Sequence, residues 1–219
     1  MPPGSLSVPA RLFLLAYDTG KDRVAGAPDL PLAIRAAVLA ELAERELIHE
    51  VDGIVTPVLG VRTGDAVLDD LLELIEESRP RKWRGWITHR ARSTASLVRQ
   101  SLVTDGYLRA ARRRVLGLFP STHYALERAG YVEVLRGEVL GALTGPAPPD
   151  EIRREDATLA ALAAAGHLRT VLRARERRHH QTRLAALTVR AGPHLPPIAR
   201  ALESAVKSAE EARSSGGGA

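Results

Sequence analysis

Residues 32–58 read LAIRAAVLAELAERELIHEVDGIVTPV, and this stretch decides the fold. Its first part, through Leu47, repeats apolar residues at helical spacing, which predicts a long amphipathic helix. Two short β-branched segments then flank Asp52 and Gly53, a dipeptide typical of the tight turn of a β-hairpin. The stretch therefore predicts a helical domain that carries a short hairpin.

The flanking sequence continues the helical pattern. The stretch SLSVPARLFLLAYD, residues 5–18, carries an apolar helical stripe that ends at the turn formers of DTGKDRVAGAPD. After the hairpin, TGDAVLDDLLELIEESRP predicts a helix with Thr63 or Asp65 as its N-cap and Pro80 as its stop. Further helices are predicted over residues 93–105, 127–143, 151–165, 167–173, 177–188 and 196–213, with a turn at Gly166.

A second hairpin is predicted where residues 107–109 pair with residues 115–119. The predicted fold class is therefore mostly α: a single helical globular domain with short β-hairpins, one of them projecting and both apolar and basic. Residues 8–213 form this domain, residues 1–7 are an N-terminal extension, and residues 214–219, SSGGGA in sequence, are expected to be a disordered tail.

The amino-acid composition indicates how the core is built and excludes several kinds of functional site. The chain has 219 residues, of which 45% are hydrophobic and only 4% aromatic, so the core must be built from Leu, Ala and Val. No cysteine is present, which excludes a disulfide framework, a thiolate metal site and a cysteine nucleophile. With neither a long apolar span nor a leader pattern near the start, we expect a cytoplasmic protein.

Charge is unevenly distributed along the chain. Residues 37–78 hold eleven acids and two arginines, a net charge of −9, whereas residues 79–114 hold eleven bases and one acid, a net charge of +10. A one-sided basic surface attracts polyanions, meaning nucleic acid or an anionic membrane. A solvated face balanced by neighbouring acids is the other interpretation.

The sequence contains no recognisable catalytic, nucleotide-binding or metal-binding motif. Both common glycine-rich phosphate loops are missing, and SAVK at residues 204–207 has none of the companion motifs of a serine–lysine enzyme. His179 and His180 are adjacent and would point about 100° apart on a helix, without a third ligand at helical spacing. We predict no catalytic residue, no metal site and no cofactor.

Residues 107–120, YLRAARRRVLGLFP, join three arginines to an apolar segment. Arg112, Arg113 and Arg114 would reach lipid phosphates, because arginine supplies clustered charged donors. Leu116, Leu118 and Phe119 would pack into the bilayer edge or a partner subunit, since an apolar hairpin is costly to leave in water. We therefore expect a homo-oligomer formed through this hairpin; packing of the hairpin on its own domain is the alternative.

In their order, several segments resemble one known family. These segments are LFLLAYD, AIRAAVLAELAERELI, TGDAVLDDLLELIEESRPRKWRGWI, LVRQSLVTDGYLR, RRRVLGLFPSTHY and ATLAALAAAGHLRTVL, and together they cover nearly all of residues 8–190. The sequence resembles the Golgi phosphoprotein 3 family, whose yeast relative is a vacuolar protein sorting adaptor. The most specific pieces are T-G-D-x-x-L-D before a helix, and V-T-D-G-Y-L followed by an arginine-rich step and L-F-P-x-T-H-Y.

The resemblance implies a mostly helical, non-enzymatic protein whose projecting hairpin binds phosphatidylinositol 4-phosphate on membranes. It assigns Arg35, within the second helix, and Arg136, in a later helix, to the lipid headgroup. The family's tryptophan before the second helix has no aromatic counterpart near Gly26, and Glu133 occupies a position that is basic in relatives.

The sequence thus predicts a cytoplasmic, peripherally membrane-associated protein that binds an anionic phospholipid or phosphoinositide through Arg35, Arg136 and the hairpin arginines. The alternative is a winged-helix nucleic-acid-binding regulator, since residues 32–58 place a helix before a wing. The wing carries acids and no Lys or Arg, so it would repel phosphate, and no nucleic acid partner is expected. A scaffold that binds protein tails is a third possibility.

Overall fold

The computed structural model describes residues 6–25, 28–115 and 119–215, and for residues 112–115 and 119–121 it describes the backbone alone. The helices are α1 (Val8–Leu15), α2 (Leu30–Glu44), α3 (Ala66–Glu77), α4 (Trp83–Thr88), α5 (Ala91–Thr104), α6 (Ala129–Thr144), the 3₁₀ turn η1 (Pro149–Glu151), α7 (Arg154–Ala165), α8 (Ala174–His179), α9 (Gln181–Arg190) and α10 (Leu195–Ser215). The strands are β1 (Tyr17–Asp18), β2 (Arg23–Val24), β3 (Ile48–Val51), β4 (Ile54–Pro57), β5 (Leu108–Val115) and β6 (Phe119–Leu126).

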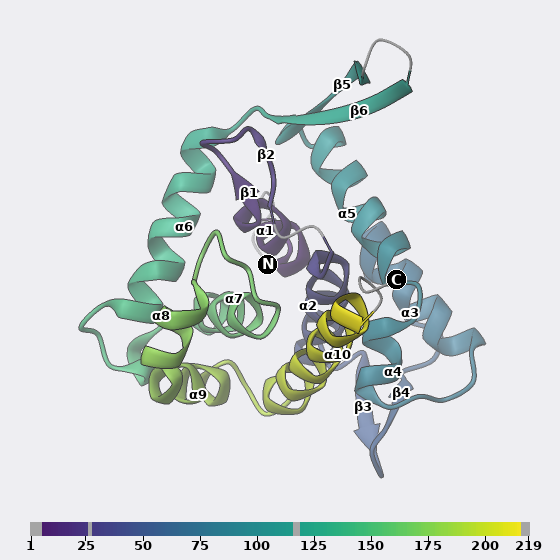
Figure 1. Cartoon of the computed structure of the whole chain (residues 1–219). Coiled ribbons are helices and arrows are strands. Elements are labelled where there is room, and N and C mark those ends of the chain that lie inside the picture. Colours follow the sequence, from purple (N-terminus) through teal and green to yellow (C-terminus); the bar gives the residue numbers. More distant parts are fainter. Residues whose placement is uncertain (1–5, 26–27, 116–118, 216–219) are drawn as a thin grey trace.

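Helix α2 lies at the centre of the molecule, with α1, α4, α5, α7 and α10 packed around it (Figure 1). Every residue from Ala33 to Ala43 is buried, and most of these are small or aliphatic. The predicted helix is confirmed, but it is not amphipathic: Arg35 and Glu41, which would have formed its wet face, are buried as well. A helix that is buried on all sides belongs to the core.

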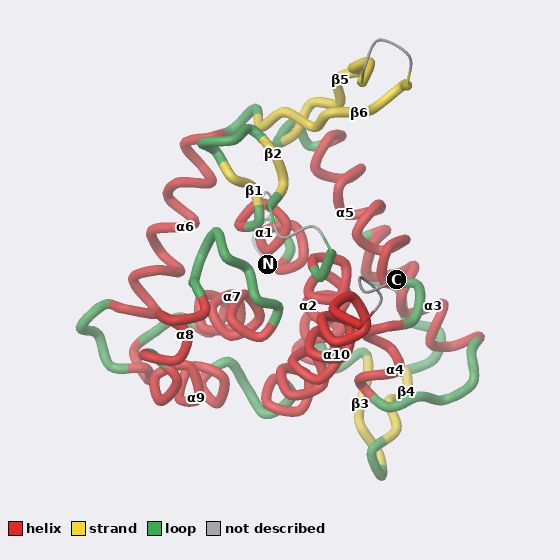
Figure 2. The backbone as a smooth tube through the Cα atoms, in the orientation of Figure 1, coloured by secondary structure: helices red, strands yellow, loops and turns green. Residues whose placement is uncertain are grey.

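All strands pair as three separate antiparallel hairpins in the described part of the chain (Figure 2). In the β3–β4 hairpin, Asp52 and Gly53 have φ angles of +52° and +77°, the left-handed pair that a tight hairpin turn requires. The predicted turn at these residues is confirmed. Strands β5 and β6 pair from Leu108 with Leu126 to Val115 with Phe119, and this hairpin projects from the helical body (Figure 1).

Helix α3 begins at the motif T-G-D-x-x-L-D. Asp65 is its N-cap, and the Asp65 carboxylate accepts hydrogen bonds from the backbone N–H groups of Val67 (2.8 Å) and Leu68 (3.2 Å). Four residues later, Asp69 accepts from the backbone N–H and the hydroxyl of Thr63. The motif is thus a helix start in which both carboxylates satisfy free backbone donors.

The loop between α7 and α8 departs from the prediction. Residues 167–173 form turns instead of a helix, because His167 adopts a left-handed φ of +54° directly after Gly166, the C-cap of α7. The loop is held in place by Thr170, whose hydroxyl donates to the carbonyl of Leu15 (2.7 Å). The short helix α4 and the β1–β2 hairpin were not predicted, and α10 continues through Ser215, two residues into the predicted tail.

The core is a single cluster of mainly Leu, Ala, Val and Ile side chains, as the composition predicts. Trp83 and Trp86 belong to it, and the Trp83 Nε1–H donates to Glu50 (2.6 Å). The prediction of a mostly α, single-domain fold is confirmed. Within the described residues, no helix combines the length and the apolar character needed to cross a bilayer.

Candidate anion-binding site

A basic cavity of about 680 Å³ lies beside the β1–β2 hairpin. Its walls come from the β1–β2 hairpin, from α6 and from the loop between α7 and α8. It is lined by Asp18, Thr19, Lys21, Arg23, Val24, Ala25, Arg136, Arg169, Thr170 and Arg173. We call it the Arg136 cavity. Its volume is typical of ligand-binding cavities, which range from about 300 to 1,000 Å³.

The β1–β2 turn is shaped by its own carboxylate. Asp18 accepts hydrogen bonds from the backbone N–H groups of Gly20 and Lys21, both at 3.1 Å, and its second oxygen lies 3.5 Å from the Lys21 ammonium. Among the described lining residues this is the only carboxylate, and its hydrogen-bonding capacity is largely used within the turn. Asp18 therefore opposes a bound anion less than a free carboxylate would.

The same hairpin is fastened to the base of the projecting β5–β6 hairpin. The buried Tyr17 hydroxyl lies 2.5 Å from Asp22 Oδ1 and 3.1 Å from the carbonyl oxygen of Tyr124. Burial and the hydrogen bond to Asp22 both raise the pKa of Tyr17, so its hydroxyl stays protonated and donates. His123 Nε2 also lies 2.7 Å from the Asp22 carbonyl. One wall of the Arg136 cavity is thus tied to strand β6.

Arg136 is the most enclosed cation of the cavity, with a side chain 16% exposed. Its Nη2 donates to the Tyr17 carbonyl (2.8 Å) and its Nη1 to Glu133 (2.8 Å). The Nε is buried and has no partner in the described part of the chain. Two of the three nitrogens are therefore pinned, which orients the guanidinium before any ligand arrives.

Glu133 acts on Arg136 without lining the cavity. Its Oε1 accepts from Arg136 and lies 3.2 Å from the Thr19 hydroxyl, so it joins α6 to the β1–β2 turn. The Glu133 side chain is 56% exposed. A carboxylate at this position therefore orients a cavity arginine and a cavity threonine, although a basic residue is expected there from the resemblance.

The electrostatics of the cavity favour an anion. Five cationic side chains, Lys21, Arg23, Arg136, Arg169 and Arg173, line it with one carboxylate. Among the described residues, Arg23, Arg169 and Arg173 make no ion pair, so their charge is not neutralised by the protein. Clustered guanidinium groups in a concave site bind phosphate or carboxylate groups through charge-assisted hydrogen bonds.

Comparison with known families identifies the fold. A model of the Golgi phosphoprotein 3 (GPP34) family matches residues 8–209. The chain belongs to the Golgi phosphoprotein 3 family. The match runs from the start of α1 into α10 and so includes every wall of the Arg136 cavity. A search among curated proteins finds no match.

In this Golgi phosphoprotein 3 family member, Arg35 and Arg136 do not lie together. Arg136 lines the cavity described above, whereas Arg35 lines a separate one of about 310 Å³ between α2, α3 and the start of α5. The structure therefore does not form the shared pocket expected from the resemblance. The part that each arginine takes in binding stays a prediction.

The hairpin residues of the prediction fall largely outside the described structure. Arg112, Arg113 and Arg114 lie on β5 and Phe119 begins β6, but only their backbone is described. Leu116 and Leu118, and also Gly26 where the family tryptophan was expected, lie outside the described residues. The contribution of these side chains to lipid or subunit contacts also stays a prediction.

Four basic residues of the Arg136 cavity were missed from the sequence: Lys21, Arg23, Arg169 and Arg173. They lie in two short segments, KDR and HLRTVLR, that are more than a hundred residues apart. The sequence shows only that each segment contains closely spaced basic residues. These residues form a site only because the loop after α7 packs beside the β1–β2 hairpin.

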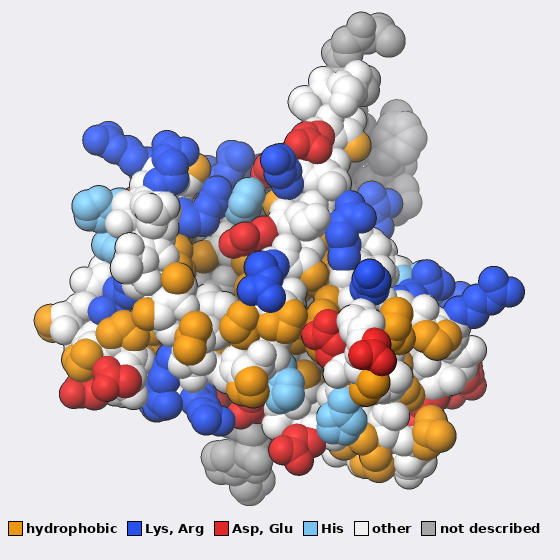
Figure 3. All heavy atoms as spheres, turned by 90° about the horizontal axis from the view of Figure 1, so that it is seen from below, with side chains coloured by type: hydrophobic (Ala, Val, Ile, Leu, Met, Phe, Trp, Pro, Cys, Tyr) orange, Lys and Arg blue, Asp and Glu red, His pale blue; other side chains and the backbone are white. Residues whose placement is uncertain are grey.

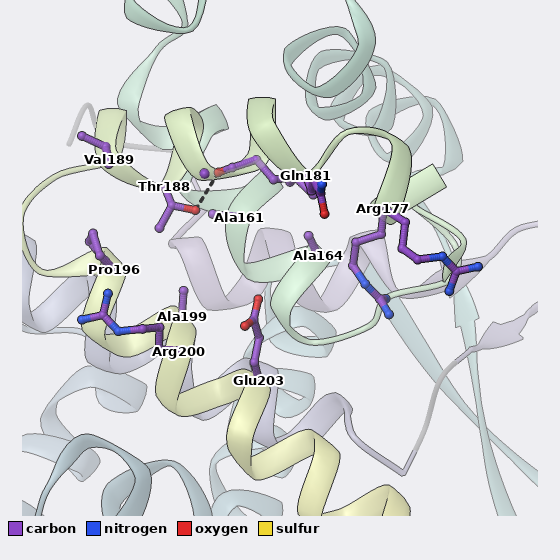
Figure 4. Close-up of a pocket in the computed structure, with 13 residues that line it drawn as sticks. Ala161, Ala164, Arg177, Gln181, Thr188, Val189, Pro196, Ala199, Arg200 and Glu203 are labelled. Carbon is purple, nitrogen blue, oxygen red and sulfur yellow. Dashed lines mark hydrogen bonds between the residues drawn. The ribbon is translucent and has the colours of Figure 1, made fainter. Parts of the chain in front are cut away.

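Another groove, of about 480 Å³, lies between α9 and α10 over the small side chains of α7 (Figure 4). Its base is formed by alanines, with Gln181 and Arg177 on one side and Arg200 and Glu203 on α10. The Thr188 hydroxyl donates to the Leu184 carbonyl (2.8 Å) and is satisfied. In the described structure none of the lining residues has a buried donor without a partner, so the groove lacks a polar group that requires a ligand.

Basic side chains are not confined to the Arg136 cavity. Seen from below, Lys and Arg side chains form several groups separated by hydrophobic and acidic ones (Figure 3). The described side chains on this face therefore form no single basic patch that would bind polyanions over its whole extent. A formed cavity is the better candidate for selective anion binding.

Proposed function

We propose that this protein is a non-enzymatic, peripheral membrane protein that binds an anionic phosphoinositide headgroup in the Arg136 cavity. Phosphatidylinositol 4-phosphate is the first candidate ligand, because that is the lipid the family resemblance implies. The single observation that carries the proposal is the set of five cations around one cavity, three of them without ion pairs in the described part of the chain.

The chemistry of the headgroup fits this set. A phosphomonoester carries close to two negative charges at neutral pH and offers three acceptor oxygens. Arg136 is oriented by Tyr17 and Glu133, and Arg169 and Arg173 line the cavity from the loop between α7 and α8, so phosphate oxygens would meet donors from two elements. The hydroxyl oxygens of Thr19 and Thr170, whose protons are donated to Glu133 and to the Leu15 carbonyl, could still accept from the hydroxyl groups of a polar ring such as inositol.

The position of the cavity relative to the β5–β6 hairpin also supports a membrane ligand. Tyr17 joins the cavity wall to the Tyr124 carbonyl on β6, and β2 contacts β6 directly. A hairpin that entered the bilayer interface would therefore hold the cavity close to the headgroups. The apolar sequence of residues 115–119, VLGLF, suits such insertion.

Arg35 is not part of this proposed headgroup site, because it lines the separate cavity beside α3. The proposal differs in this respect from the expectation based on the family resemblance, which placed Arg35 and Arg136 on one headgroup. It retains Arg136 and adds Lys21, Arg23, Arg169 and Arg173.

Flotation with liposomes tests the proposal. One series increases phosphatidylinositol 4-phosphate, and a second contains phosphatidylserine at matched surface charge. The proposal predicts that the bound fraction rises with the phosphoinositide and stays lower in the matched series. Equal binding in both series would indicate diffuse charge attraction only, and failure to bind at every composition would rule out a membrane role.

A further inference from the structure

A further cavity, of about 640 Å³, lies at the base of the β5–β6 hairpin. Its walls come from α1, β2, the start of α2, α5 and β6 (Figure 1). Helices α1, α2 and α5 pack against one another there, and β2 contacts β6. We call this the Arg99 cavity, after an arginine of α5 that lines it. Its volume is large enough for a small organic ligand.

One part of the wall of the Arg99 cavity is apolar. Phe13 of α1 and Leu30 of α2 belong to the hydrophobic core and are only 3% and 5% exposed. Val24, Pro31 and Ala95, which are partly buried, continue this apolar surface. A ligand with a hydrocarbon part would remove this surface from water, which is favourable.

The charged groups of the wall are all cations. Arg23, Arg92 and Arg99 line the cavity, and none of the described lining residues carries a carboxylate. Within the part of the chain that the structure describes, these three arginines form no ion pair. Their charge is therefore not neutralised by the protein, so the cavity favours an anion and disfavours a cation.

Arg99 is oriented before any ligand arrives. Its guanidinium carbon lies 4.5 Å from the centre of the Tyr124 ring on β6, and its Nη2 donates to the Ser96 hydroxyl oxygen (3.2 Å). Among the described residues its Nε and Nη1 have no hydrogen-bond partner. Arg92, Ser96 and Arg99 recur at the spacing of one helix face. One face of α5 thus offers two guanidinium groups and a hydroxyl to the same ligand.

The Arg99 cavity suits a different ligand from the Arg136 cavity. The wall of the Arg136 cavity combines five cations with threonine hydroxyls, whereas side chains of the hydrophobic core reach the Arg99 cavity. A phosphorylated polar ring would leave this apolar wall uncovered, and a small inorganic anion would not use it at all. An anion at the end of a hydrocarbon chain matches both parts of the wall.

We infer that the Arg99 cavity binds a free fatty acid, with the carboxylate on Arg92 and Arg99 and the hydrocarbon chain on the apolar wall. Arginine binds a carboxylate through paired, charge-assisted hydrogen bonds. Burial of the chain supplies affinity that grows with its length. The ligand contains no phosphate and forms no bilayer when it is bound singly, so the inference does not depend on headgroup binding in the Arg136 cavity.

Calorimetric titration of the full chain with decanoate, decanol and decylamine, each below its micellar range, tests the inference. Decanoate should bind at least about tenfold more tightly than the uncharged alcohol, and the cationic amine more weakly than the alcohol. From octanoate through decanoate to dodecanoate, each added methylene should tighten binding about two- to fourfold. Equal binding of decanoate and decanol would overturn the inference, as would affinity that does not change with chain length or an absence of binding at millimolar dodecanoate.

Two variants locate the site. Arg92→Gln/Arg99→Gln removes both guanidinium groups and keeps good helix formers in α5, so decanoate should bind at least about tenfold more weakly and decanol as before. Ala95→Leu keeps the charges but fills part of the apolar wall, and it should weaken dodecanoate more than octanoate. Arg175→Gln/Arg178→Gln on α8 is the matched control, because it removes two exposed arginines outside the cavity, and decanoate affinity should stay within about twofold of the wild type. Unchanged binding in both cavity variants, or an equal loss in the control, would contradict the inference.

Discussion

Asp69 connects the most specific sequence motif to a structural function. Its carboxylate accepts hydrogen bonds from Thr63 N (2.7 Å), Thr63 Oγ1 (2.8 Å) and Gly64 N (3.1 Å). Burial alone would raise the pKa of Asp69, but these three donors and the charge of Arg62 together lower it further than burial raises it, and the result lies below the ordinary value of 3.8. The carboxylate thus stabilises the turn before α3 only while it is ionised.

Asp69→Ala should lower the free energy of unfolding by about 1–3 kcal/mol at neutral pH, because three donors lose a charged acceptor. A carboxylate with a depressed pKa contributes stability above its unfolded pKa and loses it as the pH falls through the folded pKa. The difference between wild type and variant should therefore shrink below the ordinary Asp value of 3.8. Urea denaturation at neutral and acid pH measures it.

The control is Glu77→Ala on the same helix, since Glu77 is exposed and accepts no hydrogen bond in the described structure. We expect it to change the free energy of unfolding by less than about 0.5 kcal/mol. A cost for Asp69→Ala that is the same at neutral and acid pH would show that the ionised carboxylate is not the stabilising group.

At the scale of elements, α2 and the end of α7 approach each other closely at Gly166. A Cβ atom on Gly166 would lie 2.7 Å from the Ala33 Cβ and 3.0 Å from the Leu162 carbonyl oxygen. The φ of Gly166 is −83°, which any residue can adopt, so the restriction is steric and not conformational. The close packing of α2 against the end of α7 therefore depends on a glycine, which has no Cβ atom, at position 166.

Gly166→Ala should lower the free energy of unfolding by about 1–3 kcal/mol through this clash. Combining it with Ala33→Gly, which removes the opposing methyl group, should cost less than the sum of the two single changes. Gly137→Ala in α6 is the matched control, because no atom lies within 4 Å of its added Cβ, and it should stabilise by about 0.5–1 kcal/mol. Chemical denaturation of the four variants gives the comparison, and additive effects would contradict the contact.

The elements that follow a hydrophobic period were predictable from the sequence, and those set by tertiary contacts were not. Helix α3 has apolar residues at helical spacing and a clear N-cap, so its range followed from the pattern. Residues 167–173 also contain apolar residues at intervals, but they are turned by His167 and held by the hydrogen bond from Thr170 to Leu15, a partner more than 150 residues away. No local pattern contains such a contact.

The same limit applies to the cavities. Arg136 was predicted from the resemblance, but Arg169 and Arg173 become its neighbours only through the loop that follows α7. Asp70, Glu73 and Glu77 of α3 are exposed, and only the structure shows that they line a cavity together with the buried Arg35. The sequence shows which residues are charged, but only the structure shows which distant segments lie beside one another.

At the scale of the whole molecule, the β5–β6 hairpin extends away from the body (Figure 1). Its strands contact each other along their length, and its contacts with the body include those of β5 with α5, of β6 with β2, of Tyr124 with Tyr17 and of His123 with Asp22. Replacing residues 112–121 with a two-residue turn should therefore change the free energy of unfolding by less than about 1 kcal/mol.

The same replacement should reduce both liposome binding and self-association, because it removes the three arginines and the apolar segment together. Light scattering at micromolar concentration and flotation measure the two effects. A wild-type protein that is strictly monomeric would contradict the predicted homo-oligomer, and unchanged flotation of the shortened protein would contradict a membrane role of the hairpin.

The central claim is that the Arg136 cavity, and not overall positive charge, binds the headgroup. Two double variants remove the same charge: Arg169→Ala/Arg173→Ala in the cavity wall, and Arg175→Ala/Arg178→Ala on α8 outside it. All four side chains are exposed, so both variants should fold.

The decisive measurement is the affinity of both variants for liposomes containing phosphatidylinositol 4-phosphate at constant ionic strength. Each cavity arginine that bonds to phosphate contributes roughly 1.5–3 kcal/mol. We predict that the cavity variant loses at least about tenfold in affinity and the α8 variant less than about threefold. Equal losses in the two variants would contradict the account, because they would show that the lipid responds to total charge and not to a formed site.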